Sequence, residues 1–308
     1  MKNVTHIIET FTEIVACVAN ICFLRASANF NYLNIVINSM DKIFLFRGKT
    51  QMKRTIFAAA AVALTFALFG CNEKKTVEIN SAADLEGKTI GVQAGTTGEV
   101  YVGDVKDAKV QSFKSGIDAS LALKNGAIDA IVLDELPALE IVKRNDSLKI
   151  VQDKFVSEDY AIAVKKGNKA LLDSINSTIA RIKNDGNYDT LVKSFIMPSE
   201  SGVVVPKIDG IESDKVLKMG TNASFPPFEY SEGADVVGFD VSLSTLIAND
   251  FGAKLQIVDM NFDGLIAALQ SDAIDFIASG MTATDERRKN VDFSEPYYTS
   301  NQVIIVRK

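Results

Sequence analysis

Past its first 71 residues, the chain alternates short runs of β-branched residues with segments of helical periodicity. This alternation is typical of an α/β fold with largely parallel strands. A helix-then-strand unit at residues 118–134 has a similar counterpart at residues 263–280, in which the strand is predicted at residues 273–279. Superposing the two units aligns Asp134 with Gly280, each at the carboxyl end of its predicted strand. Two common helix-strand units can also resemble one another by coincidence.

Two further predicted strands each lead small polar residues into a loop. Residues 88–92 run into the loop that starts at Gln93, and residues 216–220 run into the loop that starts at Thr221. Ligands of open α/β sheets bind outside the carboxyl ends of the strands. Two facing lobes would therefore direct these loops into one cleft.

The scarce residue types exclude several chemistries. The 308 residues include one histidine, His6, and the last of the three cysteines is Cys71. A mature protein that begins at Cys71 has no imidazole or thiol for a Ser-His-Asp triad, a cysteine nucleophile or a Cys/His zinc site. We therefore expect no metal and no cofactor. Residues beyond position 71 carry 26 Lys and Arg against 36 Asp and Glu, and this acidic balance argues against a nucleic-acid partner.

The segment 52–71 has the layout of a bacterial secretory signal, with two cations ahead of an apolar run. That run, residues 56–69, is shorter than the roughly 20 residues of a bilayer span. Its end resembles a lipobox, which predicts lipidation at Cys71 and a membrane-anchored protein. A transmembrane anchor with a chance cysteine is the alternative. Residues 1–51 are predicted to be a non-native N-terminal extension, with translation starting at Met52.

Four motifs together resemble one family, the polar-amino-acid solute-binding proteins of ABC importers (family 3 of the extracellular solute-binding proteins). They are Gly-Thr-Asn-Ala-Ser-Phe-Pro-Pro-Phe-Glu-Tyr at 220–230, Gly-Phe-Asp at 238–240, and the segments 280–287 and 292–298. The resemblance spans nearly all of residues 79–308. It implies an α/β, two-lobed, periplasmic-binding-protein-like (type II) fold. It also implies an extracytoplasmic, non-enzymatic protein of the periplasm or cell surface, which binds a free polar amino acid and delivers it to the transmembrane subunits of an ABC permease.

The order of the segments departs from the family. Its usual chain begins with the segment found here at 215–308 and continues with the segment found here at 79–196. We therefore expect a circularly permuted fold, because permutation is tolerated where termini lie close together at the surface. The family layout then gives lobe 2 as 72–157 plus 302–308, the hinge as 158–161 and 297–301, and lobe 1 as 162–296 with a permutation linker at 197–214.

The resemblance implies that Arg287 holds the ligand carboxylate and that Asp134 holds its ammonium group. A planar guanidinium can give a carboxylate two parallel hydrogen bonds, which a lysine cannot. Taken alone, Arg287 also fits a surface ion pair with Glu286 or Asp292. Asp134 likewise fits an N-cap for a helix that begins near Glu135.

Seven more ligand-binding residues follow from the resemblance. Gly280 and Thr282 would share the ammonium group, Thr97 would add to the carboxylate site, Phe225 and Phe262 would flank the ligand side chain, and Asn222 and Gln93 would lie near its far end. Taken alone, Thr97 fits a helix cap, and phenylalanines are most often core residues.

The identity of the bound amino acid stays open, because Asn222 is neutral where family members that bind basic amino acids carry aspartate. Asp240 is predicted to be a helix N-cap, and Glu229 is left unassigned. An enzyme on the same scaffold, similar to cyclohexadienyl dehydratase and with Asp134 or Glu229 as general acid, is an open alternative. A ligand-sensing ectodomain and a permuted relic that no longer binds are two others.

Overall fold

The computed structural model describes residues 78–198 and 202–308, which belong to one compact unit. The predicted extension, the signal segment and Cys71 lie outside these residues. None of the helices in the described ranges has the length and hydropathy needed to cross a membrane. Nor does any group of three or more His, Cys, Asp or Glu side chains within these ranges have an arrangement that could hold a metal ion.

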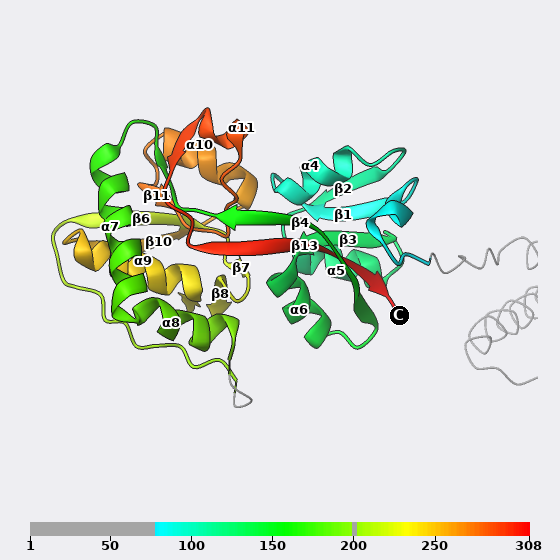
Figure 1. Cartoon of the computed structure of the whole chain (residues 1–308), viewed down its shortest axis with the longest axis horizontal. Helices are drawn as coiled ribbons and strands as arrows, with labels where there is room; N and C mark the ends of the chain where they lie inside the picture. The colour runs from blue at the N-terminus through cyan, green and yellow to red at the C-terminus, as the bar shows by residue number, and fades with distance from the viewer. Residues whose placement is uncertain (1–77, 199–201) are drawn as a thin grey trace, which may run out of the picture. The chain divides into compact units, whose positions relative to one another are not determined.

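One five-stranded sheet has the order β2-β1-β3-β13-β4 (Figure 1). The first three strands in this order are parallel, whereas β13 runs antiparallel to both of its neighbours. The strands are β1 (Thr89–Gln93), β2 (Lys109–Phe113), β3 (Ala130–Asp134), β4 (Leu148–Tyr160) and β13 (Tyr298–Arg307).

Helices cover both faces of this sheet, so its central strands are buried on both sides. Along β3, Ile131 and Leu133 pack into one apolar cluster while Val132 packs into another on the opposite face. This period of two is the geometry of a strand, and burial on both faces is typical of parallel strands. The covering elements are η1 (Ala82–Leu85) and α4 (Thr97–Gly103) on the Val132 side, and α5 (Gly116–Lys124) and α6 (Glu135–Lys143) on the other.

The second five-stranded sheet has the order β10-β6-β11-β5-β12. Strands β10, β6 and β11 are parallel, and β5 pairs antiparallel with β11 and β12. A small antiparallel sheet, β7-β8-β9, follows β6 in the chain. The bounds are β5 (Ala163–Lys165), β6 (Val216–Thr221), β7 (Ser224–Phe225), β8 (Glu229–Glu232), β9 (Asp235–Val237), β10 (Lys254–Asp259), β11 (Phe276–Ile277) and β12 (Val291–Phe293).

The second sheet is also covered on both faces. Apolar side chains of α7 and α9 pack with Met219 and Phe276, whereas those of α10 pack with Ile277 on the other face. The helical elements are α7 (Lys169–Asp185), α8 (Asn187–Leu191), the π-helical turn η2 (Val192–Ile196), α9 (Phe239–Asp250), η3 (Phe262–Gly264), α10 (Leu265–Gln270) and α11 (Asp285–Arg288). The chain thus forms two lobes, each a sheet between helices.

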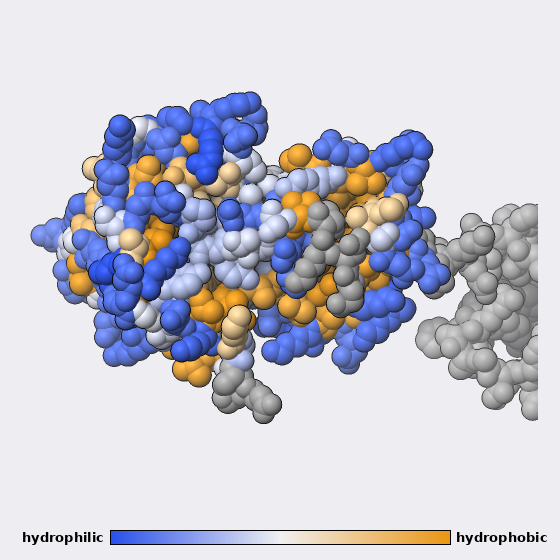
Figure 2. Space-filling model, in the orientation of Figure 1, coloured by the Kyte–Doolittle hydropathy of each residue, from blue (hydrophilic) through white to orange (hydrophobic). Residues whose placement is uncertain are grey.

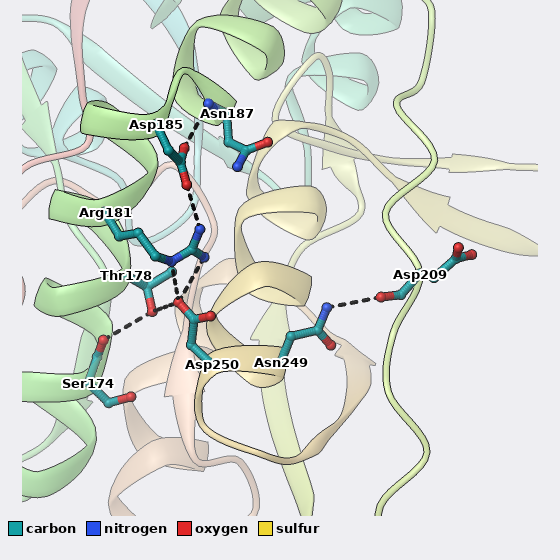
Figure 3. Close-up of polar contacts among 8 residues, drawn as sticks. All are labelled: Ser174, Thr178, Arg181, Asp185, Asn187, Asp209, Asn249 and Asp250. Atoms are coloured by element: carbon teal, nitrogen blue, oxygen red, sulfur yellow. Dashed lines mark hydrogen bonds and ion pairs between the residues drawn. The ribbon is translucent and has the colours of Figure 1, made fainter.

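An ion-pair cluster joins α7 to α9. The Arg181 guanidinium donates to Asp250 Oδ2 from Nε at 2.9 Å and from Nη2 at 2.8 Å (Figure 3). The buried Thr178 hydroxyl donates to the same carboxylate oxygen, at 2.9 Å. Beside this cluster, the Asn249 side chain donates to the backbone oxygen of Asp209 at 2.9 Å. The contacts of Thr178 and Arg181 with Asp250 connect parts of the chain that lie on opposite sides of residues 199–201.

Strands β4 and β13 pair with each other along almost their whole length and connect the two lobes (Figure 1). The pairing runs from Tyr298 opposite Tyr160 to Arg307 opposite Leu148, with an irregularity between Gln302 and Ile304. At the Tyr160 end, the Ala161 amide donates to the Met281 oxygen at 3.0 Å, which ties β4 to a loop of the second lobe.

Hydrophobic side chains are exposed on the helices of the first lobe, and Figure 2 shows hydrophobic surface over this part of the molecule. Such surface often marks contact with other proteins. The most exposed of these side chains are Val100 of α4, Ile117 and Leu121 of α5, and Leu139 of α6.

The predicted mixed α/β fold with two lobes is confirmed, and two local predictions are wrong. The strand predicted at 273–279 is limited to Phe276–Ile277, because the chain turns at Gly280 with φ of +51°. Asp240 is not a helix N-cap: Gly238 occupies that position of α9, and Asp240 lies in its first turn.

Candidate functional site

A small cavity between the two lobes is lined by all nine residues that the sequence predicts as ligand-binding. The volume open inside it is about 10 Å³, room for about one water molecule, so any larger ligand requires the lobes to part. Three further residues line it that the prediction did not include: Thr96, Glu229 and Ser279. The predicted residues are Gln93, Thr97 and Asp134 from the first lobe, and Asn222, Phe225, Phe262, Gly280, Thr282 and Arg287 from the second.

Arg287 reaches across the cavity from α11. Its Nη1 donates to the backbone oxygen of Thr282 and its Nη2 to that of Gly95, each at 2.8 Å, and its guanidinium carbon lies 5.4 Å from the centre of the Phe262 ring. Burial lowers the pKa of Arg287, but an arginine stays charged at neutral pH. Two of its five N–H groups are thus in use, and the others can serve an anion.

The surface ion pairs considered for Arg287 form with other residues. Glu286 pairs with Lys289, and Asp292 pairs with Lys166 at 2.9 Å. Arg287 therefore has no carboxylate partner among the described ion pairs, so its charge is available to a ligand.

Asp134 ends β3 and is 6% exposed. It occupies the N-cap position of α6, but its side chain makes no capping hydrogen bond there. Its Oδ1 instead accepts from the Tyr160 hydroxyl at 2.5 Å. Burial raises the pKa of Asp134 to about 6, although the Tyr160 hydrogen bond works against this rise, so the group is ionised at neutral pH.

A series of hydrogen bonds that passes through the side chain and backbone of Asn222 crosses the cavity at another point. Gln93 Nε2, from the first lobe, donates to Asn222 Oδ1 of the second lobe at 3.0 Å. The backbone N–H of Asn222 donates to the Ser279 hydroxyl at 3.1 Å, and this hydroxyl donates to Glu229 Oε1 at 2.7 Å. This chain connects both lobes to a carboxyl group that lines the cavity.

Glu229 and Asp240 form a buried carboxyl pair, each 0% exposed. Asp240 Oδ2 accepts from the Gly280 amide at 2.9 Å and from the Tyr297 hydroxyl at 2.7 Å. Burial and the neighbouring Asp240 charge raise the pKa of Glu229 well above its ordinary value, whereas burial raises that of Asp240 to about 6. Glu229 is therefore the member of the pair that holds a proton at neutral pH.

Thr282 lies beside a buried carboxylate that the sequence analysis assigned only to the hinge. Its hydroxyl donates to Glu158 Oε2 at 3.3 Å, and the same oxygen accepts from Gln302 Nε2 at 2.8 Å. Glu158 Oε1 accepts from the Tyr101 hydroxyl at 2.8 Å. Glu158 thus contacts side chains of α4, of β13 and of the second lobe.

Other predicted residues form the walls of the cavity. Thr97 is the first residue of α4 and is buried, while the N-cap is Thr96, whose hydroxyl donates to the Gln93 oxygen at 2.7 Å. A Cβ at Gly280 would meet Phe225 Cε1 at 2.7 Å, so this wall requires glycine.

One family model matches residues 217–308. This segment contains β10, β11, β12 and nearly all of β6 from the second sheet, together with β13 of the first. That family is described as bacterial extracellular solute-binding proteins, family 3. The matched segment therefore has the sequence features of an extracellular solute-binding protein.

Individual proteins also resemble this chain, over about 100 to 120 residues. The arginine-binding extracellular protein ArtP of Bacillus subtilis (strain 168) is 50% identical over 100 residues, 32% of this chain and 39% of the relative. The L-cystine-binding protein TcyJ of Escherichia coli (strain K12) is 36% identical over 119 residues, 38% of this chain and 45% of the relative. The chain thus spans less than half the length of these curated relatives. A solved structure of an ancestral arginine-binding protein bound to arginine is 49% identical over 27% of this chain and 37% of that one, with a TM-score of 0.27.

Proposed function

We propose that the described residues form a solute-binding protein that holds a free amino acid between the two lobes. One observation carries the proposal: Arg287 of the second lobe and Asp134 of the first line the same cavity, and neither has an ion-pair partner among the described residues. A free amino acid presents a carboxylate and an ammonium group at a fixed separation. A guanidinium and a carboxylate on opposite walls fit both groups.

The carboxylate of the ligand binds to Arg287, which gives up its bond to the Gly95 oxygen or shares it. Thr97, buried at the start of α4, adds its hydroxyl and backbone amide. The ammonium group binds to Asp134, to the Gly280 oxygen and to the Thr282 hydroxyl. Because the ligand contacts both lobes only when they are together, its binding shifts the protein toward the closed form.

The ligand side chain passes between Phe225 and Phe262 toward Gln93, Asn222 and Glu229. Glu229 supplies a buried carboxyl group whose oxygen Oε2 has no hydrogen-bond partner among the described residues. A cationic side chain would favour the ionised form of this group and pair with it. The ligand is therefore a basic amino acid such as arginine, in keeping with the names of several relatives.

A second function has one specific observation in its favour. Glu229 is a protonated carboxyl group at neutral pH and lines the cavity, which is what a general acid requires. A dehydratase similar to cyclohexadienyl dehydratase would use that proton. Turnover of prephenate or arogenate by the purified protein, lost in Glu229→Gln, would establish this second function instead.

The wider assignment extends the same proposal. The protein acts outside the cytoplasm, tethered by lipid on Cys71 after cleavage of the signal at 52–71, and delivers its ligand to an ABC permease. Translation starts at Met52.

The fold is a circular permutant of the family arrangement, with hinge segments in β4 and β13. The segment order supports this, and so does the packing of Ile79 and Val306 in one apolar cluster, which brings the two ends of the described chain together.

A thermal-shift screen against the twenty amino acids tests the function directly. Ligand at about 1,000 times its dissociation constant stabilises a protein by roughly 4 kcal/mol. We expect arginine or another basic amino acid to raise the melting temperature of the wild type. Arg287→Ala and Asp134→Ala should fold and show no shift, because each leaves one buried charge unpaired, at a cost of about 2–5 kcal/mol. A shift of wild-type size in either variant would remove that residue from the site.

A further inference from the structure

The hinge strand β4 holds a buried carboxylate, Glu158, whose contacts extend to the ammonium side of the cavity. Its side chain is 4% exposed and accepts three hydrogen bonds, from Tyr101, Gln302 and Thr282. All three partners carry an N–H or O–H group that can donate to a carboxylate. A buried charge is retained in a fold when such bonds satisfy it.

Backbone pairing keeps Glu158 beside Thr282. The Ala283 amide donates to the Asp159 oxygen at 3.2 Å, and Tyr160 bridges to Thr282 in antiparallel fashion. The register between β4 and the loop 281–283 therefore sets the distance between the two side chains, although they are 124 residues apart in the chain.

The direction of the Thr282 hydrogen bond has a chemical consequence. A hydroxyl group has one proton to donate and two lone pairs to offer. When the proton points to Glu158, the hydroxyl can only accept from any further partner. A group that only accepts suits an ammonium ion and disfavours a carboxylate.

We propose that Glu158 is a positioning residue of the ammonium site: it takes the Thr282 proton, so that the hydroxyl turns its lone pairs toward the α-ammonium group of the ligand. Glu158 itself does not line the cavity and acts through Thr282. This inference rests on the proposed binding of a free amino acid.

The test compares two ligands that differ only in the α-amino group, L-arginine and 5-guanidinopentanoate. Calorimetric titration gives the preference for arginine, defined as the dissociation constant of 5-guanidinopentanoate divided by that of arginine. Thr282→Val and Glu158→Leu should each lower this preference by roughly 10-fold to 100-fold, the effect of one hydrogen bond to a charged group. The double variant should lower it no further, because both changes remove the same interaction.

Conservative and control variants separate positioning from general damage. Glu158→Gln keeps an oxygen that can face Thr282 and should retain the preference within about 3-fold. Tyr101→Phe removes a donor from the other oxygen of Glu158, and Asp159→Asn removes a charge from the next residue of β4. Both should keep the wild-type preference.

The outcomes are distinct. If Glu158→Leu weakens both ligands equally, its role is structural and the inference is overturned. Should Glu158→Leu fail to fold, Thr282→Val still decides, because an unchanged preference in this variant shows that the hydroxyl does not bind the ammonium group. A wild type that binds neither ligand overturns the proposed function itself.

Discussion

The guanidinium of Arg287 and the backbone oxygen of Gly95 meet across the cleft at 2.8 Å. Gly95 belongs to the loop after β1 in the first lobe, and Arg287 belongs to α11 in the second. The approach is close because Gly95 has no side chain: with φ of +76°, an added Cβ would meet the Asp263 Cα at 2.9 Å and its Cβ at 3.0 Å. Closure of the lobes thus depends on a glycine at this position.

The added methyl group of Gly95→Ala should therefore keep the two lobes apart. We expect the variant to bind arginine at least about 10-fold more weakly, because the closed form that contacts the ligand with both lobes is disfavoured. Calorimetry gives the affinity, and small-angle X-ray scattering should detect less compaction at saturating arginine. Gly167→Ala is the matched control, since Gly167 has a similar φ of +83° and open space around it. Equal arginine affinities in the two variants would contradict this steric effect of the Cβ at position 95.

Asp134→Asn should stabilise the ligand-free protein near neutral pH. The folded-state pKa of Asp134 is raised from 3.8 to about 6, so at pH 7 the wild type bears the cost of a buried charge. Removing that charge should raise the free energy of unfolding by up to about 3 kcal/mol. The gain should shrink as the pH falls through 6 and vanish below about 3, where the wild-type group is protonated in both the folded and the unfolded state.

Arginine binding should change with pH in the opposite direction. Protonation of Asp134 below pH 6 removes the partner of the ammonium group, so affinity falls while the Asp134 contribution to stability improves. Urea titrations and calorimetry at pH 5, 6 and 7 measure both trends. A constant stability difference between wild type and Asp134→Asn over this range would refute the assignment of the titration to Asp134.

Glu229→Gln should change which ligand is preferred. The variant loses the carboxyl group that a cationic side chain would ionise, so arginine should bind at least about 10-fold more weakly while glutamine is little affected. Glu232→Gln, on the exposed end of the same strand β8, is the control and should leave both affinities unchanged. Competition binding with the two amino acids is sufficient. Equal losses for both ligands would assign Glu229 a structural role.

Reversing the proposed permutation should preserve binding. A chain that runs from residue 215 to 308, through a short Gly-Ser linker, and on from residue 78 to 198 keeps every described element of the two sheets. The linker can be short because Ile79 and Val306 share a cluster. We expect the same circular dichroism spectrum and an arginine affinity within about 3-fold of the original. An insoluble or non-binding product would argue against the permutation.

The sequence predicted the composition of the cavity better than its interactions. Motifs located Arg287 and most of the other predicted residues, and the predicted strand ends located Asp134 and Gly280. Glu158 could not be identified in this way, since it lies within a strand and has no motif. Its contact with Thr282 arises only from the pairing of β4 with the loop 281–283.

Long-range contacts also explain the errors over Asp240 and β11. Asp240 looks like a helix cap in the sequence, but its carboxylate accepts from Gly280 and Tyr297, which come from distant parts of the chain. The apolar run at 273–279 predicts a longer strand than β11, because periodicity does not reveal the left-handed turn at Gly280.

The cluster of Thr178, Arg181 and Asp250 has a consequence for how such a chain could arise (Figure 3). It fastens α7 to α9 by side chains alone, together with a shared apolar core, and does not rely on the peptide that joins them. Two separately synthesised halves, divided at that junction, would carry the information needed to reassemble this lobe.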